Sequence, residues 1–319
     1  MTVGKDLFMA TETGNVRPVV PPSFFEKFFN MPVLLLVLAT LFWSGNFVLG
    51  RAVRLDVPPV GLAFWRWFGG SLLVSGFAWP YLKRDWGVIV RHWKIITLLS
   101  ILGVTTFNTL IYTGLQFTTA LNALLMQSSM PVVIVLMTFL FFQERVTVKQ
   151  AIGITLSLFG ALAIVAQGNP AVLLGLSLNF GDVLVVVAVF CYAAYSALLR
   201  RRPALHPLSF LAITFIVGTT FLAPFYIWEN VAGRVMHFDT VTALAVLYVS
   251  IFPSILSYLF FNRGVELLGA NQAGLFIHLM PIFGSLMAML FLGERLQWFH
   301  GLGIVLIVSG ITLATRLRR

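Results

Sequence analysis

The two halves of this chain match each other at a fixed offset of 150 residues. Between residues 114–160 and 264–310, 16 of 47 ungapped positions are identical. The identities include a Met-Pro dipeptide, a Glu-Arg dipeptide and three glycines, at Met130-Pro131, Glu144-Arg145, Gly114, Gly153 and Gly160 and their copies. An apolar composition alone would not align these residue types in one register. The chain is therefore read as an internal duplication, two copies of one structural unit.

The amino-acid composition indicates that the duplicated unit lies in a membrane. The chain is 59% hydrophobic and only 10% charged, whereas soluble domains carry about 25% charged residues. The single cysteine, Cys191, excludes an intramolecular disulfide and a cysteine metal cluster. The net charge of +10 does not indicate nucleic-acid binding, because the cations are scattered between apolar runs. We expect the lipid bilayer as a partner and neither nucleic acid, metal nor cofactor.

Apolar runs of about 20 residues mark candidate membrane helices. We count ten of them, at 32–50, 59–82, 95–115, 118–142, 148–167, 181–199, 207–228, 240–262, 267–292 and 297–315. Residues 1–30 form a polar tail that we expect to be cytoplasmic. The predicted division is a first repeat at 31–167 and a second at 168–319. The fold class is then an all-α integral membrane protein with two five-helix repeats.

The charge distribution predicts that the second repeat is inverted. Five spans per repeat is an odd number, so the second repeat must enter the membrane in the opposite direction. With both termini cytoplasmic, the inner side carries sixteen Lys and Arg residues and the outer side four, namely Arg51, Arg54, Arg234 and Arg295. This asymmetry follows the positive-inside rule. Glu144-Arg145 and Glu294-Arg295 then lie on opposite sides, where we expect them to brace equivalent helix–loop corners.

The repeated pattern also carries a family resemblance. Small residues, Met-Pro, Leu-Phe-x-Gln/Gly-Glu-Arg and a spaced glycine pair run through 123–160 and 273–310, and the first repeat opens with Phe42-Trp43-Ser44-Gly45-Asn46-Phe47. In these features the chain resembles the EamA family of the drug/metabolite transporter superfamily. The resemblance implies a ten-helix carrier with a central cavity between inverted repeats. It also implies export of amino acids or related metabolites, nearest to the exporters of aromatic and other neutral amino acids.

Polar residues inside the spans are the candidates for substrate binding, because such groups are costly in hydrocarbon. Three polar pairs occupy positions related by the offset: Asn108 with Tyr258, Tyr112 with Asn262, and Ser128 with His278. Gln127 has an apolar copy. Amides, phenols and hydroxyls could bind the ammonium and carboxylate of a zwitterion. The alternative is that they only hydrogen-bond neighbouring helices together. Trp43, Asn46 and Tyr195 are further cavity candidates, with Tyr192 and Ser196 beside the last of them.

Four other residues have more specific candidate roles. His278 could switch with protonation or serve as a neutral hydrogen-bonding group. Pro131 and Pro281 should kink or loosen their spans and act as matched hinges. Arg66, between Trp65 and Trp67, is the one cation inside a span. It either extends to the outer membrane interface or forms an outer gate that steers carboxylates.

Several activities are disfavoured by what the sequence lacks. There is no phosphate-binding loop of the GxxxxGK[ST] type, so ATP does not drive the process. All eleven acidic residues lie outside the predicted mid-membrane zone, which favours a facilitator or exchanger over a carboxylate-coupled pump. No paired catalytic groups or channel filter are evident. We therefore expect not an enzyme but an exporter of small neutral metabolites in a bacterial inner membrane; the alternative is an exporter of other amphipathic solutes or organic cations. The oligomeric state stays open, and a monomer fits.

Overall fold

The computed structural model describes residues 24–53, 57–174, 179–237, 239–292, 295 and 297–315. Within these ranges the regular structure is entirely helical. The first half contains α1 (Phe24–Phe29), α2 (Pro32–Ala52), α3 (Pro59–Arg91), α4 (Trp93–Ser100), η1 (Ile101–Thr106), α5 (Phe107–Gly114), α6 (Ala120–Gln127), α7 (Met130–Phe142), α8 (Val148–Val165) and α9 (Ala171–Leu174).

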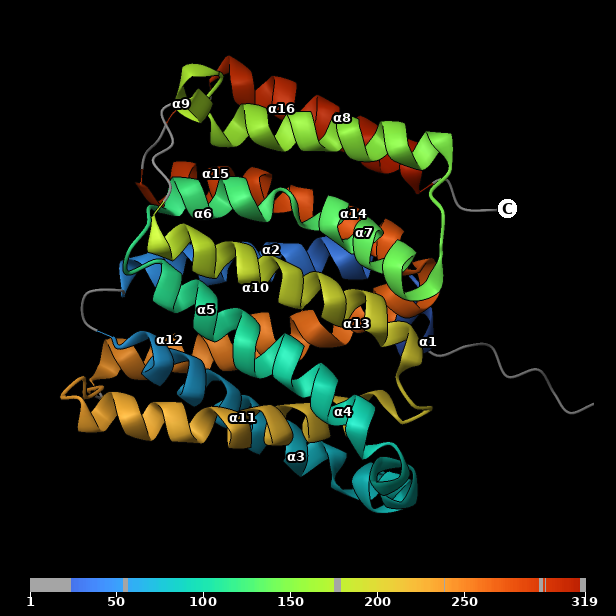
Figure 1. Cartoon of the computed structure of the whole chain (residues 1–319), viewed down its shortest axis with the longest axis vertical. Coiled ribbons are helices and arrows are strands. Elements are labelled where there is room, and N and C mark those ends of the chain that lie inside the picture. Colours follow the sequence, from blue (N-terminus) through green and yellow to red (C-terminus); the bar gives the residue numbers. More distant parts are fainter. Residues whose placement is uncertain are drawn as a thin grey trace, which may run out of the picture.

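The second half repeats most of this order. It contains α10 (Phe180–Leu198), η2 (Leu199–Arg201), α11 (Pro207–Val231), α12 (Thr240–Ser250), η3 (Ile251–Leu256), α13 (Ser257–Leu268), α14 (Ala270–Leu275), η4 (Phe276–His278), α15 (Leu279–Leu292) and α16 (Trp298–Ala314). The longest axis of the molecule is vertical in Figure 1; α8 and α16 lie together near its upper end, and α3 and α11 lie together near its lower end.

The described residues include six helical segments that are long and apolar enough to cross a membrane. They are Trp93–Gly114, Asn122–Phe142, Val148–Val165, Phe180–Arg201, Pro207–Val231 and Thr240–Leu268. Two shorter apolar helices are Pro32–Asn46 and Trp298–Ala314. The protein is thus a multi-pass, all-helical membrane protein. The count of ten spans and the cytoplasmic position of both termini stay predictions.

Equivalent helices of the two halves pack in opposite directions. Gly153 of α8 lies against Gly310 of α16, and Gly160 lies against Gly303, with each glycine facing the carbonyl of its partner. Residue numbers rise along α8 as they fall along α16, so the helices are antiparallel. Gly303 and Gly310 are the offset copies of Gly153 and Gly160. The contact is therefore self-complementary about a pseudo-twofold axis, the relation expected of inverted repeats.

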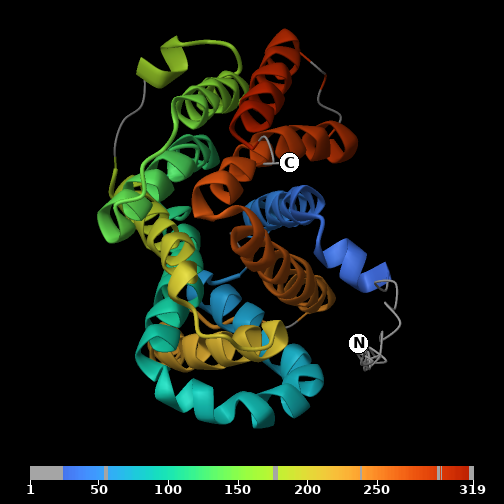
Figure 2. The same cartoon turned by 90° about the vertical axis from the view of Figure 1, so that its right-hand side faces the viewer.

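The remaining helix contacts follow the same axis. Exchanging the two halves turns the α2–α13 contact into the α10–α5 contact. It likewise turns the α2–α15 contact into the α10–α7 contact. Helices α3 and α11 pack against each other as each other's copies. In the turned view, helices of the first half (blue to green) and of the second half (yellow to red) alternate through the molecule and do not form two separate lobes (Figure 2). The centre of the molecule is consequently built from both halves.

Two kinds of interruption recur at equivalent places. The third span of each half contains a π-helical segment, η1 and η3, at positions related by the 150-residue offset. The fourth is broken just before its Met-Pro dipeptide, at 128–129 in the first half and through η4 in the second. Pro131 and Pro281 therefore lie in the first turn of α7 and α15, where proline is tolerated. The expected kink within a continuous helix is replaced by a break upstream; the hinge role stays a prediction.

Candidate functional site

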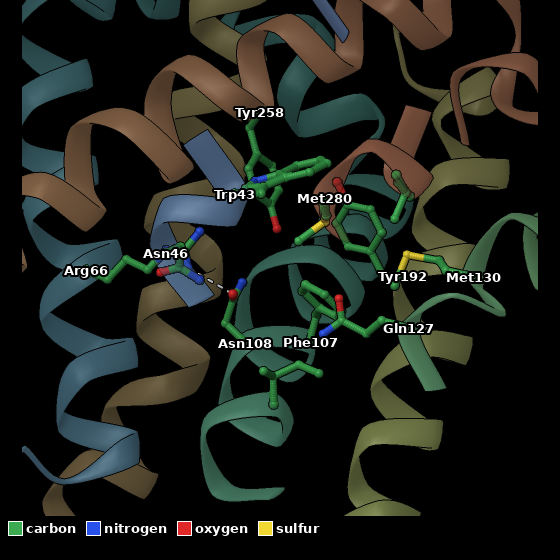
Figure 3. Close-up of a pocket in the computed structure, with 12 residues that line it drawn as sticks. Trp43, Asn46, Arg66, Phe107, Asn108, Gln127, Met130, Tyr192, Tyr258 and Met280 are labelled. Carbon is green, nitrogen blue, oxygen red and sulfur yellow. Dashed lines mark hydrogen bonds between the residues drawn. The ribbon is translucent and has the colours of Figure 1, made fainter. Parts of the chain in front are cut away.

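A cavity lies at the centre of the molecule, between the two halves (Figure 3). Its walls come from α2, α3, α5, α6 and α7 of the first half and from α10, α13, η4 and α15 of the second. The lining residues are Trp43, Asn46, Arg66, Phe107, Asn108, Ile111, Gln127, Met130, Tyr192, Tyr258, Ile277 and Met280. Six of them form offset pairs: Asn108/Tyr258, Gln127/Ile277 and Met130/Met280. Because both members of each pair face one space, the cavity lies on the pseudo-twofold axis.

The cavity is closed in this structure. The centres of water molecules can occupy only about 20 Å³ of it, which is room for one or two waters. An amino acid or a molecule of similar size would fit only after the surrounding helices separate.

Arg66 points into this cavity and not toward the membrane interface. Its residue surface is 1% exposed. Nε donates to Ser254 Oγ at 2.6 Å, Nη2 to the Pro253 carbonyl at 3.0 Å, and Nη1 lies 2.9 Å from Asn108 Oδ1 and 3.0 Å from the Tyr112 hydroxyl. Of the two alternatives for Arg66, extension to the outer interface does not agree with this position, because its hydrogen-bond acceptors lie on the interior faces of other helices.

The guanidinium has only neutral partners. Asn46 Oδ1, 3.3 Å from Nη1, completes the set, so every acceptor is a hydroxyl, an amide oxygen or a backbone carbonyl. In the described parts of the chain, no ion pair includes Arg66. The face of the Trp67 ring lies 4.7 Å from Arg66 Cζ. A guanidinium stays charged in proteins, so the cavity wall carries an uncompensated positive charge.

The π-helical segments supply two of the carbonyl groups that hold the site together. The Pro253 carbonyl accepts from Arg66 and also from Trp43 Nε1, at 3.0 Å each. The carbonyl of Gly103, its offset equivalent, accepts from the Tyr258 hydroxyl. A π turn leaves backbone carbonyls without their usual helical partners, which is why such turns recur at functional sites. A proline in mid-span is a sequence signal that could have marked the segment around Pro253, whereas Gly103 carries no comparable signal.

Within the described part of the chain, three polar groups at the cavity have no hydrogen-bond partner. They are Asn108 Nδ2, Gln127 Nε2 and the Tyr192 hydroxyl, all buried. Buried donors without acceptors are uncommon in folded proteins, and each has a physical cause. Asn108 illustrates one: its Oδ1 accepts from Arg66, so its amide N–H groups are turned away from the guanidinium. The cavity therefore presents surplus donors and a positive charge.

Two symmetry-related tyrosine–asparagine hydrogen bonds flank the cavity. In the first Tyr–Asn pair, the Tyr112 hydroxyl donates to Asn46 Oδ1 at 2.7 Å; in the second, Tyr195 donates to Asn262 Oδ1 at 2.9 Å. Tyr112 and Asn262 are offset equivalents, while Asn46 corresponds to the position next to Tyr195. Tyr112 lies two residues before the end of α5, and Tyr195 three before the end of α10. Since α5 and α10 are antiparallel, the pairs lie at opposite ends of the cavity.

A larger hollow, which we call the vestibule, lies beyond the second Tyr–Asn pair. It is lined by residues from the ends of α3 and α7 and from the segments 197–206 and 262–270, and water centres can occupy about 820 Å³ of it. Asn262 lines the vestibule. The Tyr195 ring lies 5.4 Å from the Tyr192 ring and 5.9 Å from that of Tyr258, centroid to centroid. A barrier of a few side chains thus separates vestibule and cavity.

Charged groups surround the vestibule. Arg202 pairs with Glu266 at 2.6 Å, and Arg200 with Glu144 at 3.3 Å. Asp85 accepts from the His206 amide at 2.9 Å. Burial raises the pKa of the Asp85 carboxyl, but hydrogen bonds from this amide and from Arg84 outweigh that effect and hold the pKa below its usual range. The predicted cytoplasmic cations in this group therefore gather at one end of the molecule.

Ser128 and His278 meet each other instead of facing the cavity. His278 is 1% exposed. Its Nε2 donates to the Ser128 carbonyl at 2.9 Å, and its Nδ1 lies 2.8 Å from Ser157 Oγ. The Ser157 hydroxyl also lies 3.0 Å from the Ile154 carbonyl, so its one hydrogen serves either that carbonyl or Nδ1 of a neutral His278 ring. In this conformation the two residues connect the broken fourth span to its copy near the pseudo-twofold axis.

The structure thus sorts the predicted site residues into groups. Trp43, Asn46, Arg66, Asn108, Gln127 and Tyr258 line the cavity. Tyr112, Tyr195 and Asn262 stand at its ends. Sequence reasoning missed the apolar lining at Phe107, Ile111, Met130, Ile277 and Met280, because apolar residues in a span carry no distinguishing signal. Glu294 lies outside the described residues, so the matched brace with Glu144 stays a prediction.

Comparisons with known proteins agree with this architecture. The model of the EamA-like transporter family matches residues 30–166 and again residues 179–316. The chain belongs to this family. An uncharacterized transporter of Archaeoglobus fulgidus is 28% identical over 88% of this chain and 96% of its own length. The uncharacterized transporter YyaM of Bacillus subtilis is 26% identical over 91% and 94%.

A solved crystal structure shares the fold. It has a TM-score of 0.72 and 19% identity, and the match covers 89% of this chain and 96% of the other. The EamA family belongs to the drug/metabolite transporter superfamily, and the named relatives are transporters. The protein is accordingly a membrane transporter with a small-molecule substrate. Among the described residues, no three His, Cys, Asp or Glu side chains are grouped to hold a metal ion.

Proposed function

We propose that this transporter exports small metabolites without a net charge, amino acids including aromatic ones, by alternating access. It acts as a facilitator or exchanger in a bacterial inner membrane. The observation that carries the proposal is the closed cavity on the pseudo-twofold axis, with aromatic and polar walls from both halves. A site on this axis can open toward either end by equivalent movements of the two halves.

The chemistry of the walls supports an amphipathic substrate. Aromatic surfaces from Trp43, Phe107 and Tyr192 and the thioethers of Met130 and Met280 surround a small set of polar groups. Binding sites for small molecules combine such apolar walls with a few oriented polar groups. Organic cations, the alternative substrate class, are disfavoured because the charged side chain at this cavity is a guanidinium.

The two Tyr–Asn pairs are the gates in this proposal. Each ties a helix of one half to its neighbour at one end of the cavity, and both hydrogen bonds are formed in the closed state. Opening toward the vestibule requires the second pair to separate, and opening toward the opposite end requires the first. The equivalent positions of the pairs explain how one scaffold can alternate between them.

Orientation and span count complete the proposal. The vestibule end carries Arg84, Arg200, Arg202 and Arg263, so the positive-inside rule supports a cytoplasmic vestibule. Ten spans with both termini cytoplasmic, divided at 31–167 and 168–319, fit the swapped helix contacts.

The test is a flux panel with purified protein in liposomes. We expect efflux of aromatic and aliphatic amino acids, little movement of organic cations, and no requirement for a proton or sodium gradient. Met130→Trp, which fills the cavity, should abolish flux. Leu72→Trp is the matched control, because Leu72 is 61% exposed on the outer surface of the bundle. Absence of flux for every solute, or equal flux through the Met130→Trp protein, contradicts the proposal.

A further inference from the structure

We propose that Arg66 is the anion-binding group of the cavity and that it binds the carboxylate of a substrate with an apolar body. The inference rests on the proposed transport through this cavity and names the chemistry that the cavity selects. It also changes the emphasis from a zwitterion to its carboxylate, because the ammonium has no charged partner at this site.

The charge of Arg66 has no ionic partner within the described residues. Burying an ionised group is costly unless an opposite charge accompanies it. Arg66 is 1% exposed, and its five acceptor groups are all neutral. None of the described residues that line the cavity is Asp or Glu. If Arg66 had only a structural role, we would expect a carboxylate beside it or a neutral side chain in its place. A bound anion supplies the missing negative charge.

Within the described residues, the cavity also has hydrogen-bond donors without acceptors. Asn108 Nδ2, Gln127 Nε2 and the Tyr192 hydroxyl are buried donors at the same cavity without acceptors. A carboxylate offers about four acceptor sites and no donor. Figure 3 shows Arg66 and Asn108 joined by a hydrogen bond on one side of the space, with Gln127 and Tyr192 across from them. A ligand carboxylate, together with a carbonyl or other oxygen next to it in the ligand, could accept hydrogen bonds from the donors on both sides of the cavity.

Charge balance and the apolar lining determine which ligands fit the rest of the cavity. One guanidinium neutralises one negative charge, so a dicarboxylate or a phosphate dianion would leave charge unpaired in a low-dielectric site. The remaining lining is aromatic, aliphatic or thioether, from residues such as Trp43, Phe107, Ile277 and Met280. An arylalkyl or branched aliphatic carboxylate matches this division. An α-ammonium group is permitted by the neutral hydroxyl and amide oxygens but is not selected.

The experiment measures equilibrium binding to purified protein for four ligands that share a phenylalkyl body: 3-phenylpropanoate, L-phenylalanine, 3-phenylpropanamide and phenethylamine. Wild-type protein should bind the two carboxylates at least about thirty-fold more tightly than the amide and the amine, the factor typical of a buried charge pair. Arg66→Gln should abolish this preference. Arg66→Lys, which keeps the charge but loses the forked geometry, should retain part of it.

Arg91→Gln is the matched control, because it removes an exposed cation from the end of the same helix, and it should bind like wild type. Equal binding of 3-phenylpropanoate and 3-phenylpropanamide by wild-type protein overturns the inference without any variant. So does an Arg66→Gln protein that keeps the carboxylate preference. Either result leaves the proposed transport intact if the flux panel is positive, whereas a flux panel without transport overturns the proposed function itself.

Discussion

Removing one hydroxyl from either Tyr–Asn pair should bias the protein toward opening at that end. Tyr195→Phe breaks the 2.9 Å bond to Asn262 Oδ1, and Tyr112→Phe breaks the 2.7 Å bond to Asn46 Oδ1. A neutral hydrogen bond contributes a net of about 0.5–1.5 kcal/mol. If the bond exists only while that gate is closed, its loss raises the open population by about 2- to 13-fold. Tyr112→Phe should reach the upper end, since Arg66 Nη1 loses a partner as well.

The assay reads access to the cavity from each side. A cysteine at Met280, which lines the cavity and is 7% exposed, is introduced after Cys191→Ser removes the native thiol. A membrane-impermeant thiol reagent is then added to one face of oriented vesicles. Tyr195→Phe should accelerate labelling from the vestibule side by the factor above and leave the other side unchanged. Tyr112→Phe should do the reverse.

The control is Tyr226→Phe, which removes a hydroxyl that accepts from Trp65 Nε1 away from the cavity; it should change neither rate. Equal acceleration from both sides by either variant would mean that the hydrogen bonds stabilise the bundle generally and do not gate it. Acceleration by Tyr195→Phe from the far side alone would refute the assignment of ends.

Three further predictions concern the scaffold. Replacing Pro131 and Pro281 by Ala should slow flux in liposomes more than it weakens substrate binding, and unchanged flux would remove the hinge hypothesis. Gly160→Ala would place a Cβ 2.8 Å from a carbonyl oxygen of α16 and should cost about 1–3 kcal/mol by overpacking, seen as a lower unfolding temperature. Gly284→Ala, with open space around its Cβ, is its control. Asp85→Asn should lower the unfolding temperature at pH 7, because a depressed native pKa stabilises the fold above the ordinary pKa of Asp; this difference should vanish as acid protonates the carboxylate.

The duplication and its inversion could be predicted because both depend on patterns that survive in one dimension. The register of Gly153 and Gly160 with their copies required only counting, and the contact of α8 with α16 follows it. The same register found Asn108 and Tyr258, which face one cavity. The sequence could thus predict which equivalent residues lie near the pseudo-twofold axis.

The direction in which each side chain points around its helix axis could not be predicted from the sequence. Ser128 and His278 satisfy the same offset as Asn108 and Tyr258, yet they turn toward each other and away from the cavity. The π-helical turns were also missed, because a π turn depends on tertiary packing more than on local propensity. Without η3 there is no reason to expect the Pro253 carbonyl as an acceptor for Arg66. The interior orientation of Arg66 follows from that acceptor and its neighbours.

The two π-helical carbonyls show where the symmetry of the scaffold ends. Gly103 and Pro253 occupy equivalent backbone positions, and each carbonyl accepts a hydrogen bond from another helix. At Gly103 the donor is the neutral Tyr258, whereas at Pro253 one donor is the charged Arg66, whose offset copy is Ile216. A symmetric scaffold can open to either end at similar cost, but a single cation makes the ligand lie in one orientation across the axis. If the inference about Arg66 holds, the carboxylate remains on the first half in both access states, and exchange between states moves the second half around it.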